Sequence, residues 1–449
     1  MTKEDTPATV HDAKQAGEVR SRWEWAEPSV WTDRMLIALE EGVKGGVWFS
    51  LIDKVASERN LEAAARRVIA NRGGAGVDHV NVRQFKKAVD GEVEKLHRAL
   101  EAGEYQPQAI RRVYIPKPGT AEKRPLGIPT VRDRTVQTAL RSVLEPIFEK
   151  TFAECSYGFR PGRGCKDALR RVTELLSAGY TWVVDADLKG YFDTISHEGL
   201  MARVRERVTD GRVLELVESF LHQPIFENLK EWTPSEGTPQ GAVISPLLSN
   251  IFLNPLDHLI SDAGYKIVRY ADDFVVLCRT QEEAQRALAA IQKWTGEVGL
   301  TLHPSKTKIV GLDADHGFDF LGYHFRRSKR FPQRINRWPR EKSLKRVRDN
   351  LRPVTRRTNG RSLAATIAKI NPILRGWFEY YKHSTILTDF VRLDGWIRRR
   401  LRSILRKRRK RKGRATGADH QRWPNAYFSK HGLLSLVAAH AEVTQSSRR

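Results

Sequence analysis

At 449 residues the chain is longer than one ordinary domain and can bury a sizeable core. Its formal net charge of +25 at pH 7 and its isoelectric point near 10.1 are typical of a protein that binds nucleic acid. No apolar run approaches the ~20 residues of a membrane-spanning helix. The three scattered cysteines exclude a disulfide framework and a zinc site. The first residues lack the apolar core of a secretion signal, so we expect a cytoplasmic protein.

Residues 1–60 form an N-terminal extension that begins polar and is expected to be partly disordered. Apolar residues between Trp31 and Ile52 predict a helix and a docking segment in its second half. Further helical patterns follow up to Tyr105, interrupted by glycines at 73–76. The spacing of these glycines is too irregular for a phosphate-binding motif, which favours a flexible loop.

The next clear element is a strand that begins at Trp182 and ends in acidic residues. Val183 and Val184 open the β pattern, and the two-residue side-chain period places Asp185 and Asp187 on the same face. If a second pair of acids elsewhere in the chain supplies two ligands of a metal site, only one of Asp185 and Asp187 is needed as the third. The spacing does not choose between them.

That second pair is Asp272 and Asp273, which lie between two short apolar runs at 267–268 and 274–277. The runs predict two buried strands joined by a tight turn that presents both carboxylates. Because Asp is common in turns, a plain acidic turn is the alternative interpretation. Paired carboxylates suit two Mg²⁺ ions, since Mg²⁺ prefers oxygen ligands and two ions hold both the attacking and the leaving oxygen of a phosphoryl transfer. The two acidic strand ends can lie side by side.

A helix is predicted after Ser245-Pro246, and beyond Arg340 the pattern becomes wholly helical. Leu363, Ile367 and Ile370 share a helix face. Pro372 is expected as the first residue of a new helix, where its missing N–H costs little.

An apolar series at helical spacing, from Phe390 to Leu405, carries a concentration of positive charge. Such a run is often a solvated face or tail, and a nuclear-localisation signal is a further alternative. We favour a helix that binds the phosphates of a nucleic acid. Its predicted contact residues are Arg398, Arg399, Arg402, Arg406, Lys407, Arg408 and Arg409.

Several motifs together resemble a known family. Residues 187–193, the Thr-Pro-Gln-Gly turn within 237–250 and the Tyr-Ala-Asp-Asp sequence at 270–273 look like the palm of reverse transcriptases. They are closely similar to the reverse transcriptase/maturases encoded by group II introns. The upstream segments that resemble this family's fingers are 113–118, 123–134 and 156–163. The downstream segments that resemble its last palm blocks and its maturase domain are 299–308, 320–325 and 371–381.

The resemblance implies an α+β fold of the right-hand polymerase type. Fingers and palm, built from an antiparallel sheet plus helices, are followed by an all-helical thumb or maturase domain. The implied divisions are 61–180 for the fingers, 181–328 for the palm, 335–415 for the thumb with its basic run, and 416–449 for a C-terminal tail. Some members carry a C-terminal His-Asn-His nuclease with paired cysteines, and the cysteines of this chain do not supply one.

The resemblance also assigns the metal ligands. Asp187, Asp272 and Asp273 would hold two Mg²⁺ ions, with the backbone carbonyl of Leu188 as a further ligand. Asp185 then becomes a supporting residue.

The same resemblance assigns residues to the nucleotide. Phe192 matches the bulky residue that packs under the sugar and rejects a ribose 2′-hydroxyl, with a buried core side chain as the alternative. Gln240 matches a contact to the incoming nucleotide. Lys117 and Arg124 match the cations that hold the triphosphate, and each could instead be a solvated surface charge.

Lys306 lies where polymerases often place a general acid for pyrophosphate, and the nearby Lys308 is the alternative. Arg160 and Arg163, in the segment that resembles the fingers, are predicted to contact nucleic acid.

The implied function is an RNA-directed DNA polymerase, in which the primer 3′-hydroxyl attacks the α-phosphate of a deoxynucleoside triphosphate. Its implied partners are an RNA template with a DNA or RNA primer, the parent intron RNA, whose splicing it assists, and the target DNA of retromobility. One alternative is a splicing maturase with little polymerase activity, which intact acids at 187, 272 and 273 disfavour. Others are retron, diversity-generating, defence-linked or repair reverse transcriptases. The oligomeric state stays open.

Overall fold

The computed structural model describes residues 17–116, 123–228, 230–312, 317–331, 333–413 and 416–446. These residues divide into two compact units. Unit 1 contains the described parts of 1–116, 122–172 and 184–309. Unit 2 contains 173–183 and the described part of 310–449. The predicted boundary between palm and thumb, at 328–335, remains a prediction, because compactness does not define a functional domain.

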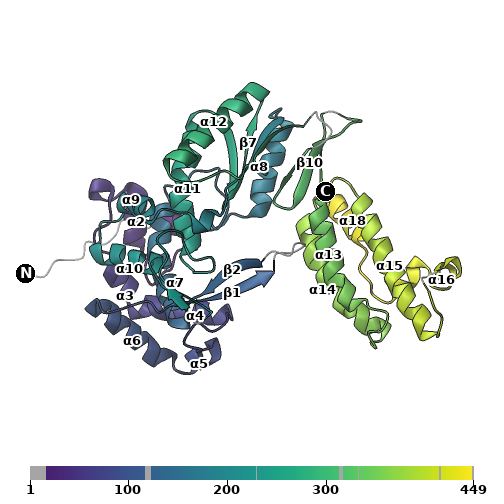
Figure 1. Ribbon diagram of the computed structural model, residues 1–449, viewed down its shortest axis with the longest axis horizontal. Coiled ribbons are helices and arrows are strands. Elements are labelled where there is room, and N and C mark those ends of the chain that lie inside the picture. Colours follow the sequence, from purple (N-terminus) through teal and green to yellow (C-terminus); the bar gives the residue numbers. More distant parts are fainter. Residues whose placement is uncertain are drawn as a thin grey trace, which may run out of the picture. The chain divides into compact units, whose positions relative to one another are not determined.

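Unit 1 begins with a group of helices (Figure 1). They are α2 (Asp33–Glu41), α3 (Ile52–Ala56), α4 (Glu58–Ala70), α5 (Val82–Lys87) and α6 (Val89–Ala102). α2 confirms the helix predicted in the N-terminal extension. Trp31, just before α2, is fully buried, and its indole N–H donates to the carbonyl of Ser142 at 2.9 Å. The expected disorder at the start of the chain falls on residues 1–16, outside the described residues.

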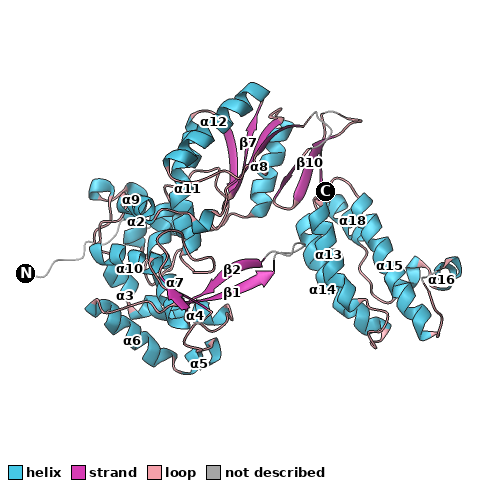
Figure 2. Cartoon of the chain, in the orientation of Figure 1, coloured by secondary structure: helices cyan, strands magenta, loops and turns pink. Residues whose placement is uncertain are grey.

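A four-stranded sheet in unit 1 has the order β2-β1-β4-β5. Its strands are β1 (Ile110–Pro116), β2 (Lys123–Ile128), β4 (Ile225–Glu227) and β5 (Lys230–Trp232). β1 and β2 form the long antiparallel hairpin visible in Figure 2, in which Arg111 pairs with Ile128 and Ile115 with Arg124. The long helix α7 (Val131–Glu149) follows β2 and is buried along most of its length.

The acidic strands lie in a second four-stranded sheet with the order β6-β7-β3-β8. Its strands are β3 (Trp182–Asp187), β6 (Lys266–Tyr270), β7 (Asp273–Cys278) and β8 (Lys308–Gly311). Helices α11 (Ser245–Asp262) and α12 (Gln281–Glu297) pack on β6 and β7 (Figure 1). The predicted strands and the helix after Ser245-Pro246 are confirmed. The two acidic strand ends are neighbours, since β3 lies next to β7.

The remaining elements of this region connect the two sheets. They are α8 (Cys165–Ser177), the short 3₁₀ helix η2 (Tyr191–Asp193), α9 (His197–Arg205) and α10 (Gly211–Leu221).

In unit 2, a three-stranded sheet of order β11-β10-β9 precedes six helices. The strands are β9 (Phe318–Phe320), β10 (Tyr323–Arg327) and β11 (Ile335–Pro339). The helices are α13 (Glu341–Val354), α14 (Leu363–Tyr381), α15 (Thr388–Arg408), α16 (Gly417–Arg422), α17 (Asn425–Lys430) and α18 (Leu436–Ser446). The helical pattern predicted beyond Arg340 is confirmed.

One helix boundary was predicted wrongly. α14 runs without a break through Pro372, which was expected to open a new helix. Ile370 and Leu374, on either side of the proline, are both fully buried. Packing of one continuous apolar face therefore offsets the hydrogen bond that a proline removes from a helix interior. Among the described residues, no helix combines the length and the apolar character that crossing a membrane requires.

Candidate active site

The two adjacent aspartates lie at the turn of the β6–β7 hairpin. Tyr270 pairs with Asp273 across the hairpin, so that Ala271 and Asp272 form the turn itself. Ala271 is buried and has a φ of +59°, a left-handed conformation that is uncommon for a residue with a side chain. Strained backbone of this kind persists only where the surroundings hold it, and it is enriched at functional sites.

Asp187 ends β3, beside this turn, and the carboxylates interact. Burial is the main cause that raises the pKa of Asp272, and the neighbouring charge of Asp187 raises it further. The cations of Arg124 and Arg269 act in the opposite direction. The structure therefore brings two of the three predicted metal ligands close enough for their charges to repel, which is a condition that a bound cation relieves.

Two lysines, Lys306 just before β8 and Lys308 at its first residue, face the acids of β3. Lys306 Nζ lies 2.7 Å from Asp187 Oδ2, and Lys308 Nζ lies 3.8 Å from Asp185 Oδ2. The backbone N–H of His303 donates to the carbonyl of Asp187 at 2.7 Å and holds this segment against β3. The structure thus pairs each lysine with a different acid, a distinction that sequence spacing does not make.

The donor types suit a hard divalent cation, because all three acids offer carboxylate oxygens. In the part of the chain that the structure describes, no group of three or more His, Cys, Asp or Glu side chains is gathered closely enough to hold a metal ion. Asp187 is instead engaged by Lys306. The ammonium of Lys306 contacts one oxygen of this carboxylate, Oδ2. Leu188, the proposed carbonyl ligand, follows directly and is paired with Leu302.

Phe192 and Gln240 meet at one cavity. Phe192, in η2, is half-buried, and its carbonyl accepts a hydrogen bond of 2.6 Å from the N–H of Thr238. The side chains of Phe192, Asp193 and Gln240 line a cavity of about 260 Å³ together with Arg112. The amide of Gln240 donates to Asp193 Oδ2 at 3.5 Å.

The turn that carries Gln240 is bonded to the β1–β2 hairpin as well. The N–H of Gly127 donates to the carbonyl of Gln240 at 2.7 Å. Gly241 has a φ of +111°, and a Cβ there would lie 2.5 Å from the Gly127 carbonyl oxygen. Only glycine fits this close approach of two backbones.

Two residues, Arg124 and Lys117, were predicted to bind the triphosphate, and the structure describes only Arg124. Arg124 is exposed on β2, and its charge reaches Asp272, where it lowers the pKa of that carboxyl against the effect of burial. Lys117 lies outside the described residues.

Arg160 differs from its prediction as a nucleic-acid contact. Its side chain is only 2% exposed and is ion-paired with Glu149, with Nε 3.0 Å from both carboxylate oxygens. Its Nη1 donates to the carbonyls of Ala153 and Ser156. All of these partners are internal, so Arg160 is not available to a phosphate. Arg163, which pairs with exposed Glu154, stays closer to the surface.

The basic residues of α15 point in different directions. Arg402 is buried, and it donates to the carbonyl of Trp423 and to Asn425 Oδ1, both at 2.9 Å. The prediction that it contacts nucleic acid is therefore not supported. Arg398 lies 3.7 Å from Asp394, and Arg406 lies 2.7 Å from Asp419. The exposed members of the predicted set are Arg399, Lys407, Arg408 and Arg409.

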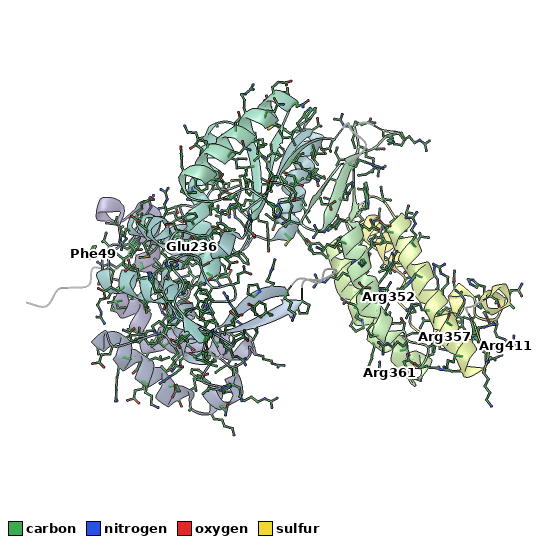
Figure 3. The ribbon with its side chains drawn as sticks, viewed as in Figure 1. Phe49, Glu236, Arg352, Arg357, Arg361 and Arg411 are labelled. Carbon is green, nitrogen blue, oxygen red and sulfur yellow. The ribbon has the colours of Figure 1, made fainter. Side chains whose placement is uncertain are left out.

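Sequence reasoning missed a second group of arginines near the end of this helix. Arg352 lies on α13, and Arg357 and Arg361 lie in the connection to α14 (Figure 3). Arg357 Nη2 donates to the carbonyl of Arg411 at 3.5 Å, and Arg408 donates to the carbonyl of Arg361. Residues separated by about fifty positions in sequence thus form one basic surface. In the sequence, only the adjacent Arg356 and Arg357, between two predicted helices, could have indicated this basic group.

A buried arginine was missed as well. Arg269 interrupts the apolar sequence of β6 directly before the Tyr-Ala-Asp-Asp turn, and its guanidinium is fully enclosed. A charged residue on a buried strand was the signal that could have identified it.

Comparison with known proteins adds two family matches. Residues 115–325 match the family described as reverse transcriptase (RNA-dependent DNA polymerase). Residues 344–423 match the group II intron, maturase-specific domain. The first match contains Asp185, Asp187, Asp272 and Asp273, and the second contains most of α13 to α16.

The chain is also similar to individual proteins. Protein YkfC of Escherichia coli (strain K12) is 36% identical over 310 residues, in an alignment that covers 60% of this chain and 81% of that protein. The group II intron-encoded protein LtrA of Lactococcus lactis subsp. cremoris is 36% identical over 207 residues, which are 46% of this chain and 34% of LtrA. In a solved partial Cas6-RT-Cas1–Cas2 complex, a chain with 27% identity aligns over 56% of this chain and 42% of its own length, with a TM-score of 0.36.

Proposed function

Because the chain belongs to the reverse transcriptase/maturases encoded by group II introns, we propose that it synthesises DNA on an RNA template and also assists the splicing of its parent intron. The observation that carries the polymerase proposal is the position of Asp187 at the end of β3 and of Asp272 at the turn before the neighbouring strand β7, where the charge of Asp187 raises the pKa of Asp272. The maturase-specific match over 344–423 supports the second role.

Reverse transcriptases generally use divalent metal ions, and we assign two Mg²⁺ ions to the site. Asp187, Asp272, Asp273 and the carbonyl of Leu188 would hold them. When bound, such ions lower the pKa of the primer 3′-hydroxyl and stabilise the charge of the leaving pyrophosphate. Lys306, whose ammonium lies 2.7 Å from Asp187, is our candidate for the proton donor to pyrophosphate.

The nucleotide would bind between the turn that carries Gln240 and the β1–β2 hairpin. Phe192 would lie beneath the sugar, where a ring leaves no room for a ribose 2′-hydroxyl. Arg124, already within electrostatic reach of Asp272, would neutralise the triphosphate, together with Lys117.

RNA would bind to exposed cations of unit 2. The proposed surface combines two groups of side chains, those of α15 and those of the α13–α14 connection. Its members are Arg399, Lys407, Arg408, Arg409, Arg352, Arg357, Arg361 and Arg411. RNA contacts of this kind depend on phosphates, 2′-hydroxyls and shape. The partners are then the intron RNA, a primed RNA template, deoxynucleoside triphosphates and target DNA. The three unpaired cysteine thiols are in keeping with a reducing compartment such as the cytoplasm.

Asp272→Asn tests the polymerase proposal, because the amide keeps the shape of the side chain and loses its charge. With Mg²⁺ and a primed RNA template, we expect the full-length protein to extend the primer and the variant to make no DNA. Binding of intron RNA should be equal in the two proteins. Extension by the variant at the wild-type rate would show that the metal assignment is wrong.

The same experiment decides the second candidate, a splicing maturase with little polymerase activity. A wild-type protein that promotes intron splicing and extends no primer would favour that candidate over ours.

A further inference from the structure

The hairpin that carries the aspartates is held from behind by a buried ion pair. Arg269 on β6 and Asp257 on α11 both have side chains that are 0% exposed. Arg269 Nε lies 2.8 Å and 3.0 Å from the two carboxylate oxygens of Asp257, and Nη2 lies 2.5 Å from one of them. Burial of two charges is costly unless geometry is good and additional hydrogen bonds satisfy the remaining donors.

The remaining N–H donors of the guanidinium reach the turn of the β6–β7 hairpin, directly before Asp272. Arg269 Nη1 donates to the carbonyl oxygen of Ala271 at 3.0 Å and to Asn250 Oδ1 at 2.8 Å. Ala271 is the residue with a φ of +59°, and it directly precedes Asp272. The arginine therefore fixes the carbonyl of the strained residue from inside the protein.

The other side of the turn is closed by the loop before α8. The Asn250 amide donates to the carbonyl of Gly158 at 2.8 Å. A Cβ on Gly158 would lie 2.2 Å from the backbone nitrogen of Ala271, so the two backbones are in direct contact. Asn250 thus links the guanidinium to the loop that presses on the turn, and the left-handed conformation of Ala271 is held from two directions.

We propose that Arg269, Asp257 and Asn250 form a positioning network, which fixes the direction in which the turn presents the carboxylates of Asp272 and Asp273. None of the three touches the proposed metal site; they act through the backbone of Ala271. The inference rests on the proposed polymerase function. Residues that orient metal ligands from behind commonly change metal affinity or activity by about 10- to 100-fold when mutated.

The test compares Asp257→Asn with Asp210→Asn in the full-length protein. Asp210 is a matched control in the same unit, because it is also buried, and it accepts hydrogen bonds from the backbone N–H groups of Leu51 and Ile52. Both variants should unfold at a lower temperature than wild type. Only Asp257→Asn should bind Mn²⁺ more weakly, by about 10- to 100-fold, as measured by electron paramagnetic resonance on the primer–template complex.

Steady-state kinetics provide the second measurement. Asp257→Asn should lower kcat and leave the KM for the nucleotide near its wild-type value, because the nucleotide contacts are unchanged. Loss of thermal stability alone, with wild-type Mn²⁺ affinity and kcat, would overturn the proposal. An equal loss of Mn²⁺ affinity in Asp210→Asn would overturn it too, since the effect would then be general.

If Asp257→Asn does not fold, the double variant Arg269→Met/Asp257→Leu replaces the pair without leaving an unpaired buried charge. It also removes the hydrogen bonds to Ala271 and Asn250, so we expect the same loss of Mn²⁺ affinity. Wild-type Mn²⁺ affinity in this variant would contradict the positioning role. Failure of the proposed function has a different signature, because the wild-type protein itself would then extend no primer.

Discussion

Phe192 is the residue whose proposed role is easiest to separate from a structural one. Phe192→Ala would open space beneath the sugar, so incorporation of ribonucleotides should rise relative to deoxynucleotides. The ring is half-buried, and its loss should therefore lower the free energy of unfolding by less than the about 3–5 kcal/mol of a fully buried Phe→Ala change. The measurement is the ratio of kcat/KM for the two nucleotide classes.

Phe252→Ala, which removes a buried ring from α11, is the control for that experiment. It should destabilise the protein more and leave the ratio unchanged. An unchanged ratio in Phe192→Ala as well would leave only a packing role for Phe192.

Because His197 is buried, we expect the free energy of unfolding to depend on pH. Burial, with a smaller effect of His222, lowers the pKa of His197, and its Nε2 lies 2.7 Å from the carbonyl of Gly237. The unfolded chain, with a histidine pKa near 6.5, then binds more protons than the folded protein at acidic pH. The free energy of unfolding should therefore fall as the pH decreases below about 6.5.

Urea unfolding at several pH values measures this dependence. His197→Gln should show a flatter profile between pH 5 and 7, whereas a variant of exposed His258 should keep the wild-type profile. Parallel profiles for wild type and His197→Gln would assign the pH dependence to other groups.

At the residue scale, the chemistry of the site was predictable and its burial was not. The acidic pairs 185/187 and 272/273 could be singled out because acids at the ends of apolar strands are unusual without a bound cation, and the family resemblance then selected Asp187 over Asp185. Arg402 was predicted as a nucleic-acid contact from the basic run and Arg160 from its place in a segment that resembles the fingers, whereas both are enclosed and hydrogen-bonded internally. Sequence patterns register the charge of a side chain, and only the packed structure decides whether that charge faces water.

At the scale of elements, α15 and the α13–α14 connection form the proposed RNA surface. Changing the exposed Lys407, Arg408 and Arg409 to Gln should weaken intron RNA binding. Each phosphate contact that is lost should make the log–log dependence of affinity on salt shallower by about 0.7 to 0.9. Turnover at saturating template-primer should fall far less than affinity.

A control variant changes the same number of charges on another helix. Arg83, Lys86 and Lys87 are exposed on α5, and their replacement by Gln should leave the salt dependence of intron RNA binding unchanged. Parallel salt dependences for wild type and the α15 variant would mean that RNA binds elsewhere.

Local periodicity predicted the acidic strands and several of the helices, because their apolar residues recur at the spacing of a buried strand or helix face. β3, β6 and β7 follow from alternating or continuous apolar residues with acids at their ends, and α15 follows from apolar residues at helical spacing. Pro372 shows the limit of local rules, since α14 continues through it when both flanking turns are buried. Tertiary packing thus overrides a local preference for a helix start.

At the scale of the whole molecule, the order of motifs agrees with two matched regions, a reverse transcriptase region followed by a maturase-specific region. The compact units do not follow this linear order. Residues 173–183 belong to unit 2, where Thr173 accepts a hydrogen bond from Arg337 and the carbonyl of Thr181 accepts one from the N–H of Leu312. Contacts between segments so far apart in the chain leave no mark in a linear pattern.

By itself, the sequence determined the class of the protein, the acidic strand ends, the hairpin between them and the helical C-terminal region. The class follows from the resemblance of several motifs, in order, to one family. The strand ends, the hairpin and the helical region follow from local chemistry, through side-chain period, turn residues and the need of paired acids for a cation. The tertiary structure alone decided that Lys306 pairs with Asp187 and that Arg269 lies behind Ala271. It also decided that the side chain of Arg357 donates a hydrogen bond to the carbonyl of Arg411. These are contacts between distant segments, and burial and backbone geometry select them only once the chain has folded.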